Sequence, residues 1–152
     1  MIPPPPARPL PHQLFEQQVL RTPGNIAAVC GHESLTFQAL NDRANDLAGR
    51  LAGNGVGTGD YVGIGLPRSL DLLIALLGIL KAGAAYIPVD PSYPAERIPH
   101  MIASSGMRMM VTDSAQRPAF GDTPVMEIRP SPDATVTPPG QAVSQDGYTV
   151  AP

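Results

Sequence analysis

The charged side chains that could do chemistry are few, and each has a structural explanation. Lys81 stands at the end of an apolar helical pattern, where a cation stabilises the negative end of a helix, so we assign it a structural role. Asp90 and Arg97 flank a proline-containing loop, and their opposite charges predict an ion pair across that loop rather than a catalytic pair. Tyr86 and Tyr93 are expected to lie at the sheet edge and in the loop, with their hydroxyl groups near water.

Metal, thiol and phosphate sites are poorly supported by the spacing. His12, His32 and His100 fall in three unrelated segments without the spacing of metal ligands. The single cysteine, Cys30, lies in an apolar run, which predicts a small buried thiol and a reducing cytoplasm. The alternating glycines within residues 55–59 follow a helix and precede a strand, the reverse of a dinucleotide-binding loop. The sequence therefore predicts no catalytic, cofactor-binding or metal-ligating residue in this chain.

The elements that would position such side chains alternate between helix and short apolar strand. Helical spacing predicts helices over 12–21 and 37–53, and a third, apolar on all sides, that is capped by Ser69 and buried on several faces. A fourth helix ends at Ser104-Ser105-Gly106 and must begin late or kink, because Pro99 cannot sit in a helix interior. Strands are predicted at 26–30 and 34–37, which form a hairpin, and at 61–65, 85–89, 109–112 and 124–128. This alternation predicts a parallel sheet with right-handed crossovers.

Composition sets the domain limits and excludes two classes of partner. Prolines crowd both ends, which predicts a stiff linker over 1–11, a folded domain over 12–128 and a low-complexity, disordered tail over 129–152. The 13 acidic and 10 basic residues are interspersed without a basic stripe, so we expect no nucleic-acid partner. The longest apolar stretch, Leu70 to Leu80, is too short to span a bilayer, so we expect no membrane partner.

Three segments carry a resemblance to a known family. LTFQAL (35–40), LKAGAAYIPVD (80–90) and PSYPAER (91–97) resemble the first two core motifs of nonribosomal peptide synthetase adenylation domains. The similarity extends in order and spacing over about residues 12–113. It implies the α/β class, as an incomplete N-terminal subdomain of the acyl-adenylate-forming fold, with a short, mostly parallel sheet, flanking helices and an N-terminal β-hairpin.

The resemblance also implies an activity for the complete domain. Such domains use ATP and Mg²⁺ to convert an amino acid into an aminoacyl-adenylate and pass it to a carrier protein. The resemblance therefore implies a carrier protein and neighbouring synthetase modules as partners. The family's phosphate loop, ribose-binding aspartate and catalytic lysine follow the second motif, and here only GYTVAP (147–152) faintly resembles the approach to that loop. We therefore expect this chain to be truncated before the phosphate loop, to bind no cofactor and to be inactive alone. A non-catalytic interaction module and one half of a split enzyme are the alternatives.

Overall fold

The computed structural model describes residues 2–4, 7–128, 135–136 and 149–150. Its elements, in chain order, are α1 (Pro11–Arg21), β1 (Ile26–Cys30), β2 (Glu33–Thr36), α2 (Phe37–Gly53), β3 (Tyr61–Gly65), α3 (Leu70–Lys81), β4 (Ala85–Pro88), α4 (Arg97–Ser105), β5 (Met109–Thr112), the 3₁₀ helix η1 (Arg117–Phe120), β6 (Val125–Glu127), β7 (Thr135–Val136) and β8 (Thr149–Val150).

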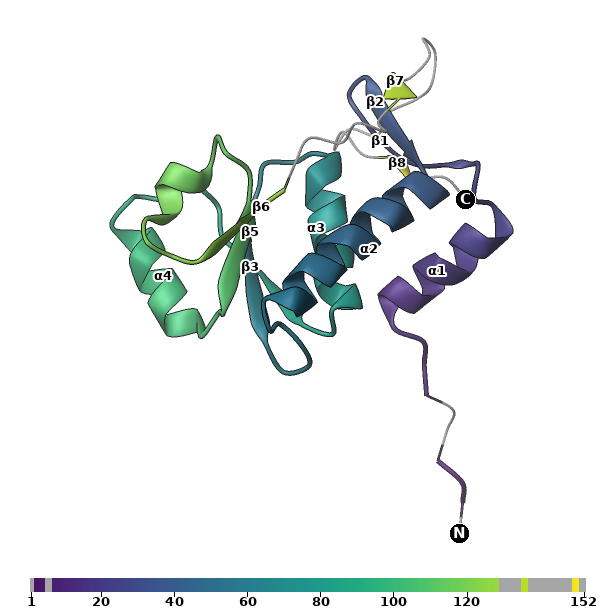
Figure 1. Ribbon diagram of the computed structural model, residues 1–152, viewed down its shortest axis with the longest axis horizontal. Coiled ribbons are helices and arrows are strands. Elements are labelled where there is room, and N and C mark those ends of the chain that lie inside the picture. Colours follow the sequence, from purple (N-terminus) through teal and green to yellow (C-terminus); the bar gives the residue numbers. More distant parts are fainter. Residues whose placement is uncertain (1, 5–6, 129–134, 137–148, 151–152) are drawn as a thin grey trace.

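The parallel sheet is the part of the fold on which the candidate site is built. Its strand order is β4-β3-β5-β6, and every neighbouring pair is parallel. Helices α2 and α3 lie on one face of this sheet and α4 on the other (Figure 1). The predicted α/β architecture, with a parallel sheet, flanking helices and a hairpin, is confirmed.

The N-terminal hairpin forms a second, antiparallel sheet on the far side of α2 and α3 (Figure 1). Gly31 turns the chain between β1 and β2 with φ of 60°, a conformation that glycine adopts without a steric penalty. The short strands β7 and β8 pair with β2 and β1, which gives the order β7-β2-β1-β8. Most of the predicted tail over 129–152 lies outside the described residues.

Two apolar clusters lie on opposite faces of the parallel sheet. The larger joins the hairpin, α2, α3 and one face of the sheet, and Met109 and Val111 of β5 point into it. The smaller lies under α4 and η1 and consists of Val89, Ile98, Met110 and Phe120. Alternate residues of β5 therefore enter different clusters, as expected for a strand covered on both faces.

The helix ends follow the predicted signals. The hydroxyl of Thr36 accepts a hydrogen bond from the Ala39 N–H at 3.1 Å and so caps α2. Helix α4 begins at Arg97, which places Pro99 in the first turn, where its missing N–H would have no helical partner. Of the two predicted alternatives, a late start and a kink, the structure shows the late start.

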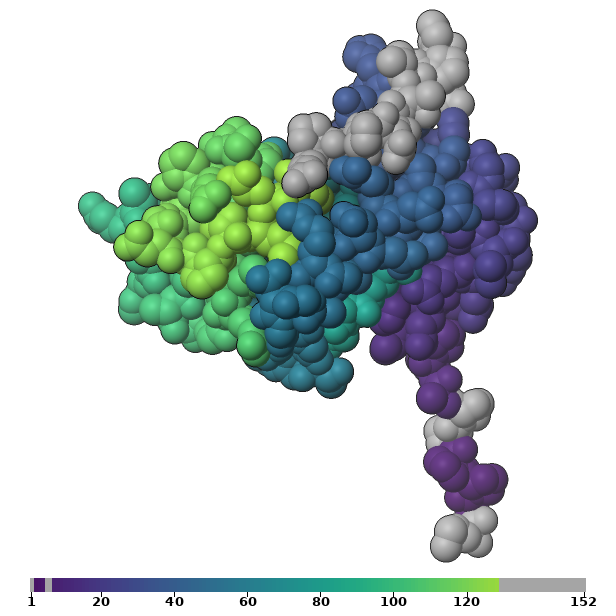
Figure 2. All heavy atoms as spheres, viewed as in Figure 1, coloured from purple at the N-terminus to yellow at the C-terminus, as the bar shows by residue number. Residues whose placement is uncertain are grey.

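The proline-rich leader extends away from the folded body. Helix α1 begins at Pro11, one residue before the predicted helix start, with proline at its first position. Residues 2–4 and 7–9 are exposed and extend away from the folded body (Figure 2).

Candidate functional site

The carboxyl edge of the parallel sheet is the place where this topology favours a binding site. From β3 the chain moves outward to β4, then crosses back to place β5 on the other side of β3. This reversal makes a topological switch point between β3 and β5, where open α/β sheets bind their ligands. The candidate site is therefore sought in the loops that follow these strands.

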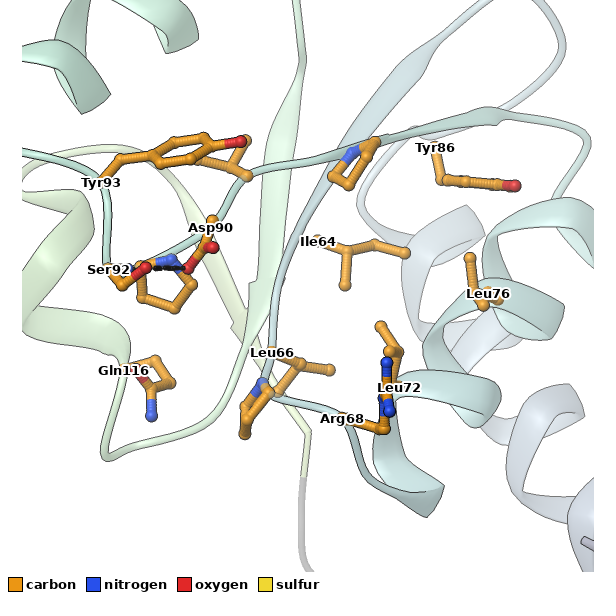
Figure 3. A pocket seen from close by; sticks show the side chains of 14 residues that line it. Ile64, Leu66, Arg68, Leu72, Leu76, Tyr86, Asp90, Ser92, Tyr93 and Gln116 are labelled. Atoms are coloured by element: carbon orange, nitrogen blue, oxygen red, sulfur yellow. Dashed lines mark hydrogen bonds between the residues drawn. The ribbon is translucent and has the colours of Figure 1, made fainter. Parts of the chain in front are cut away.

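A groove of about 820 Å³ opens at this edge, between β3, β4 and α3. Its apolar side is formed by Ile64, Leu72 and Leu76, with the ring of Tyr86 above them (Figure 3). Asp90, Ser92, Tyr93 and Gln116 lie at the other side (Figure 3). Tyr86 is 44% exposed and Tyr93 38% exposed, so the prediction that both tyrosines lie at the surface is confirmed.

The loop after β4 is held by local contacts rather than by an ion pair. Ser92 donates to Asp90 Oδ1 from its backbone N–H at 2.9 Å and from its hydroxyl at 2.7 Å. The backbone bond, and then the hydroxyl bond, lower the pKa of Asp90 below its usual value. The guanidinium of Arg97 lies over the ring of Tyr93, 5.4 Å from its centroid.

The predicted ion pair between Asp90 and Arg97 is therefore wrong. Asp90 satisfies its carboxylate within two residues, as aspartate in turns commonly does. Arg97 instead makes a cation–π contact with Tyr93. The segment Asp90-Pro91-Ser92 already carried the signal of such a turn in the sequence.

The loop after β3 leads into α3 through a cap. The hydroxyl of Ser69 accepts a hydrogen bond from the Leu72 N–H at 3.2 Å and donates one to the Pro67 carbonyl at 3.0 Å. This predicted cap orients the first turn of α3, which carries Leu72 into the groove.

Ser69→Ala is expected to lower the free energy of unfolding by about 1 kcal/mol, because the Leu72 N–H loses its acceptor. Urea titration followed by circular dichroism measures this loss. Ser69→Asp keeps an acceptor and should retain most of the stability; an equal loss in both variants would contradict the cap.

A buried hydrogen bond locks the switch point. The hydroxyl of Thr112, which is fully buried at the end of β5, donates to the Gly65 carbonyl at 2.6 Å. It therefore ties the carboxyl ends of β5 and β3 together. Local sequence patterns do not reveal this contact, because it joins residues 47 positions apart.

Asp71, in the first turn of α3, has a raised pKa. Burial has the largest effect; the charge of Arg43 opposes it, and the charges of Asp113 and Glu33 add to it. The folded protein therefore holds the Asp71 proton more tightly than the unfolded chain does.

The pKa of Asp71 predicts a pH dependence of stability. The stabilising contribution of the protonated Asp71 side chain is greatest at pH values below its usual pKa of 3.8. This contribution is lost as the pH rises through the raised pKa of the folded state. Asp71→Asn cannot ionise, so relative to this variant the original chain should lose stability as the pH rises from below 3.8 towards neutrality. Urea midpoints across this range measure the difference, and a difference that does not vary with pH would contradict the assignment.

The other candidate residues lie apart from the groove or from one another. Lys81, whose side chain is 6% exposed, pairs with Glu16 and so joins α3 to α1. Cys30, which was predicted to be buried, is half-buried and is the last residue of β1, beside the hairpin turn. The three histidines lie in α1, the hairpin turn and α4. Within the described residues no three His, Cys, Asp or Glu side chains form a group that could hold a metal ion.

The groove lining fits apolar and aromatic contacts better than a nucleotide. Its charged side chains are Arg68 and Asp90, and the Asp90 carboxylate is already bonded to Ser92. A triphosphate with its metal needs several donors directed at the phosphates. The described lining does not match that requirement.

No helix among the described residues has the length and apolar character to cross a membrane.

Comparison with known proteins identifies the family. Residues 15–147 match the family described as "AMP-binding enzyme". A plipastatin synthase of Bacillus subtilis is 51% identical over 100 residues, which cover 66% of this chain and 4% of the synthase.

Solved structures agree in fold. The nonribosomal peptide synthetase FmoA3, in its AMPPNP-bound form, is 30% identical with a TM-score of 0.73, over 87% of this chain and 15% of that one. The N-terminal subdomain of Klebsiella oxytoca NpsA, solved with 3-hydroxyanthranilyl-AMSN, is 26% identical with a TM-score of 0.69, over 77% of this chain and 30% of that one. The chain thus spans less than a third of each of these three relatives. It belongs to the AMP-binding enzyme family, and it corresponds to the N-terminal portion of a nonribosomal peptide synthetase adenylation domain.

Proposed function

We propose that this chain forms the first part of a domain that activates an amino acid as its adenylate for loading onto a carrier protein. In this reaction a carboxylate oxygen attacks the α-phosphorus of ATP, and the bond to pyrophosphate breaks. The single observation that carries the proposal is the match to the AMP-binding family across residues 15–147, on a fold shared with a solved adenylation subdomain. A free thiol at Cys30 fits a reducing compartment such as the cytoplasm.

We further propose that the 152 residues do not catalyse adenylation by themselves. The NpsA subdomain contains more than three times the length that this chain matches. The groove lining does not fit a metal–triphosphate group, so we assign no ATP-binding step to the described residues. Their role is to hold the carboxyl edge of the parallel sheet, through the Ser69 cap and the bond from Thr112 to Gly65.

Amino-acid-dependent exchange between ATP and pyrophosphate tests both proposals. The purified chain, supplied with the common amino acids, should show no exchange above background. A chimera in which the 100 aligned residues of this chain replace their counterparts in a plipastatin synthase adenylation domain should show it.

The two exchange measurements test different claims. Exchange by the chain alone would overturn its inactivity. An inactive chimera, beside an active parent domain under the same conditions, would overturn the role of the chain in adenylation.

A further inference from the structure

Helix α3 is apolar all round, but the described residues bury only part of its surface. Leu70, Ile74, Ala75, Gly78 and Ile79 face α2 and the sheet and are buried. A second set of leucines remains half-buried and consists of Leu72, Leu73, Leu76, Leu77 and Leu80. Because a helix that is apolar on all sides is typical of a protein interior, the second set indicates a further layer.

The half-buried side of α3 continues into the groove. Leu72 and Leu76 point towards Ile64, and the exposed ring of Tyr86 completes an apolar surface that runs from α3 to β4 (Figure 3). We call this surface, formed by Ile64, Leu72, Leu76, Tyr86 and Pro88, the α3–β4 face. Contiguous apolar surfaces of this kind mark sites of contact with other proteins, membranes or ligands.

The outer edge of β4 favours packing of side chains over extension of the sheet. The N–H groups of Ala85 and Val89 donate to carbonyls of Asp60 and Ile64, at 3.0 and 2.8 Å. Alternate residues of a strand direct their backbone groups to opposite sides, so position 88 faces outward. Proline there has no N–H to offer, as is typical of an edge strand.

We infer that the α3–β4 face is covered by the part of an adenylation subdomain that this chain does not match. The inference rests on the proposed function and names the partner surface. The length of the solved NpsA subdomain supports this occupant, because the region that matches 77% of this chain is only 30% of the NpsA chain. The rest of that chain is further polypeptide in the same subdomain, in a fold that superimposes on this one.

The accessibility of one introduced thiol tests the inference directly. In a Cys30→Ala background, Leu76→Cys is labelled with a maleimide in the 152-residue chain and in the plipastatin synthase chimera. Labelling of Leu76→Cys should be slower in the chimera by about tenfold or more. The matched control is Leu14→Cys: Leu14 is 52% exposed on α1, outside the α3–β4 face, so its labelling should be equally fast in both proteins.

Several results would overturn the inference. Equal labelling of Leu76→Cys in both proteins would show that the face stays open. Labelling of the chain alone that slows as its own concentration rises would assign the face to a second copy.

A binding measurement keeps the test decisive if the chimera folds poorly. The 152-residue chain should co-purify with the separately expressed remainder of the plipastatin synthase subdomain. Leu76→Asp should weaken this binding by about tenfold, because the substitution would bury a charge at the contact. Leu14→Asp should not weaken it. No co-purification, or equal weakening by both variants, would also overturn the inference.

The failure of this inference can be told apart from the failure of the proposed function. A chimera that protects the thiol introduced at position 76 but shows no exchange activity would remove only the proposed function. An active chimera in which the same thiol reacts as fast as in the chain alone would remove only this inference.

Discussion

Leu47→Ala is expected to lower the free energy of unfolding by about 2–5 kcal/mol. Leu47 lies on α2, is 2% exposed and packs against α3 at Gly78. A Cβ on Gly78 would lie 2.7 Å from a methyl carbon of Leu47, so the two helices already approach closely at this point. Truncation of Leu47 would leave a cavity between two helices that the hairpin and the sheet hold in place. Urea unfolding followed by circular dichroism measures the loss.

Leu20→Ala provides the matched control. Leu20 is the same residue type on α1 but is 84% exposed. Its replacement should change the free energy of unfolding by no more than about 0.5 kcal/mol. If Leu47→Ala cost no more than Leu20→Ala, the packing of α2 on α3 would be wrong.

The elements of this fold could be predicted because their signals are local. The apolar spacing from Leu40 to Leu51 predicts α2, and the cap at Thr36 fixes its start. Proline is not tolerated in a helix interior, so Pro99 alone restricts where α4 can begin. The residues that form the hairpin turn lie next to one another in the chain, and Gly31 marks its position.

The contacts that shape the candidate site could not be predicted in the same way. The bond from Thr112 to Gly65 depends on β5 lying beside β3, and no local pattern records that strand order. Helix η1 was not predicted either, because four residues with one proline carry little periodicity, yet it supplies Phe120 to a buried cluster. The half-buried side of α3 was missed for a related reason. An all-apolar helix predicts burial, but not whether this chain or another polypeptide provides the cover.

Gly65 is expected to be the backbone position of the site that is most sensitive to substitution. It lies at the carboxyl end of β3, where a Cβ would come within 2.2 Å of Phe120 Cζ and 2.5 Å of Cε2. Phe120 is 3% exposed and belongs to the cluster under α4, so its ring has little room to move. Gly65→Ala should therefore lower the free energy of unfolding by about 1–3 kcal/mol through overpacking.

A double-mutant cycle separates this overpacking from other effects of the substitution. Phe120→Ala alone should cost about 3–5 kcal/mol, because it removes a buried ring. In the double variant the methyl group introduced at position 65 enters the space that the ring has left. The free energy lost by the double variant should therefore be smaller than the sum of the losses in the two single variants, by at least about 1 kcal/mol. Urea unfolding of the four proteins gives this coupling energy. Additive losses would show that Phe120 does not press on Gly65, and the contact that joins η1 to the switch point would then have to be abandoned.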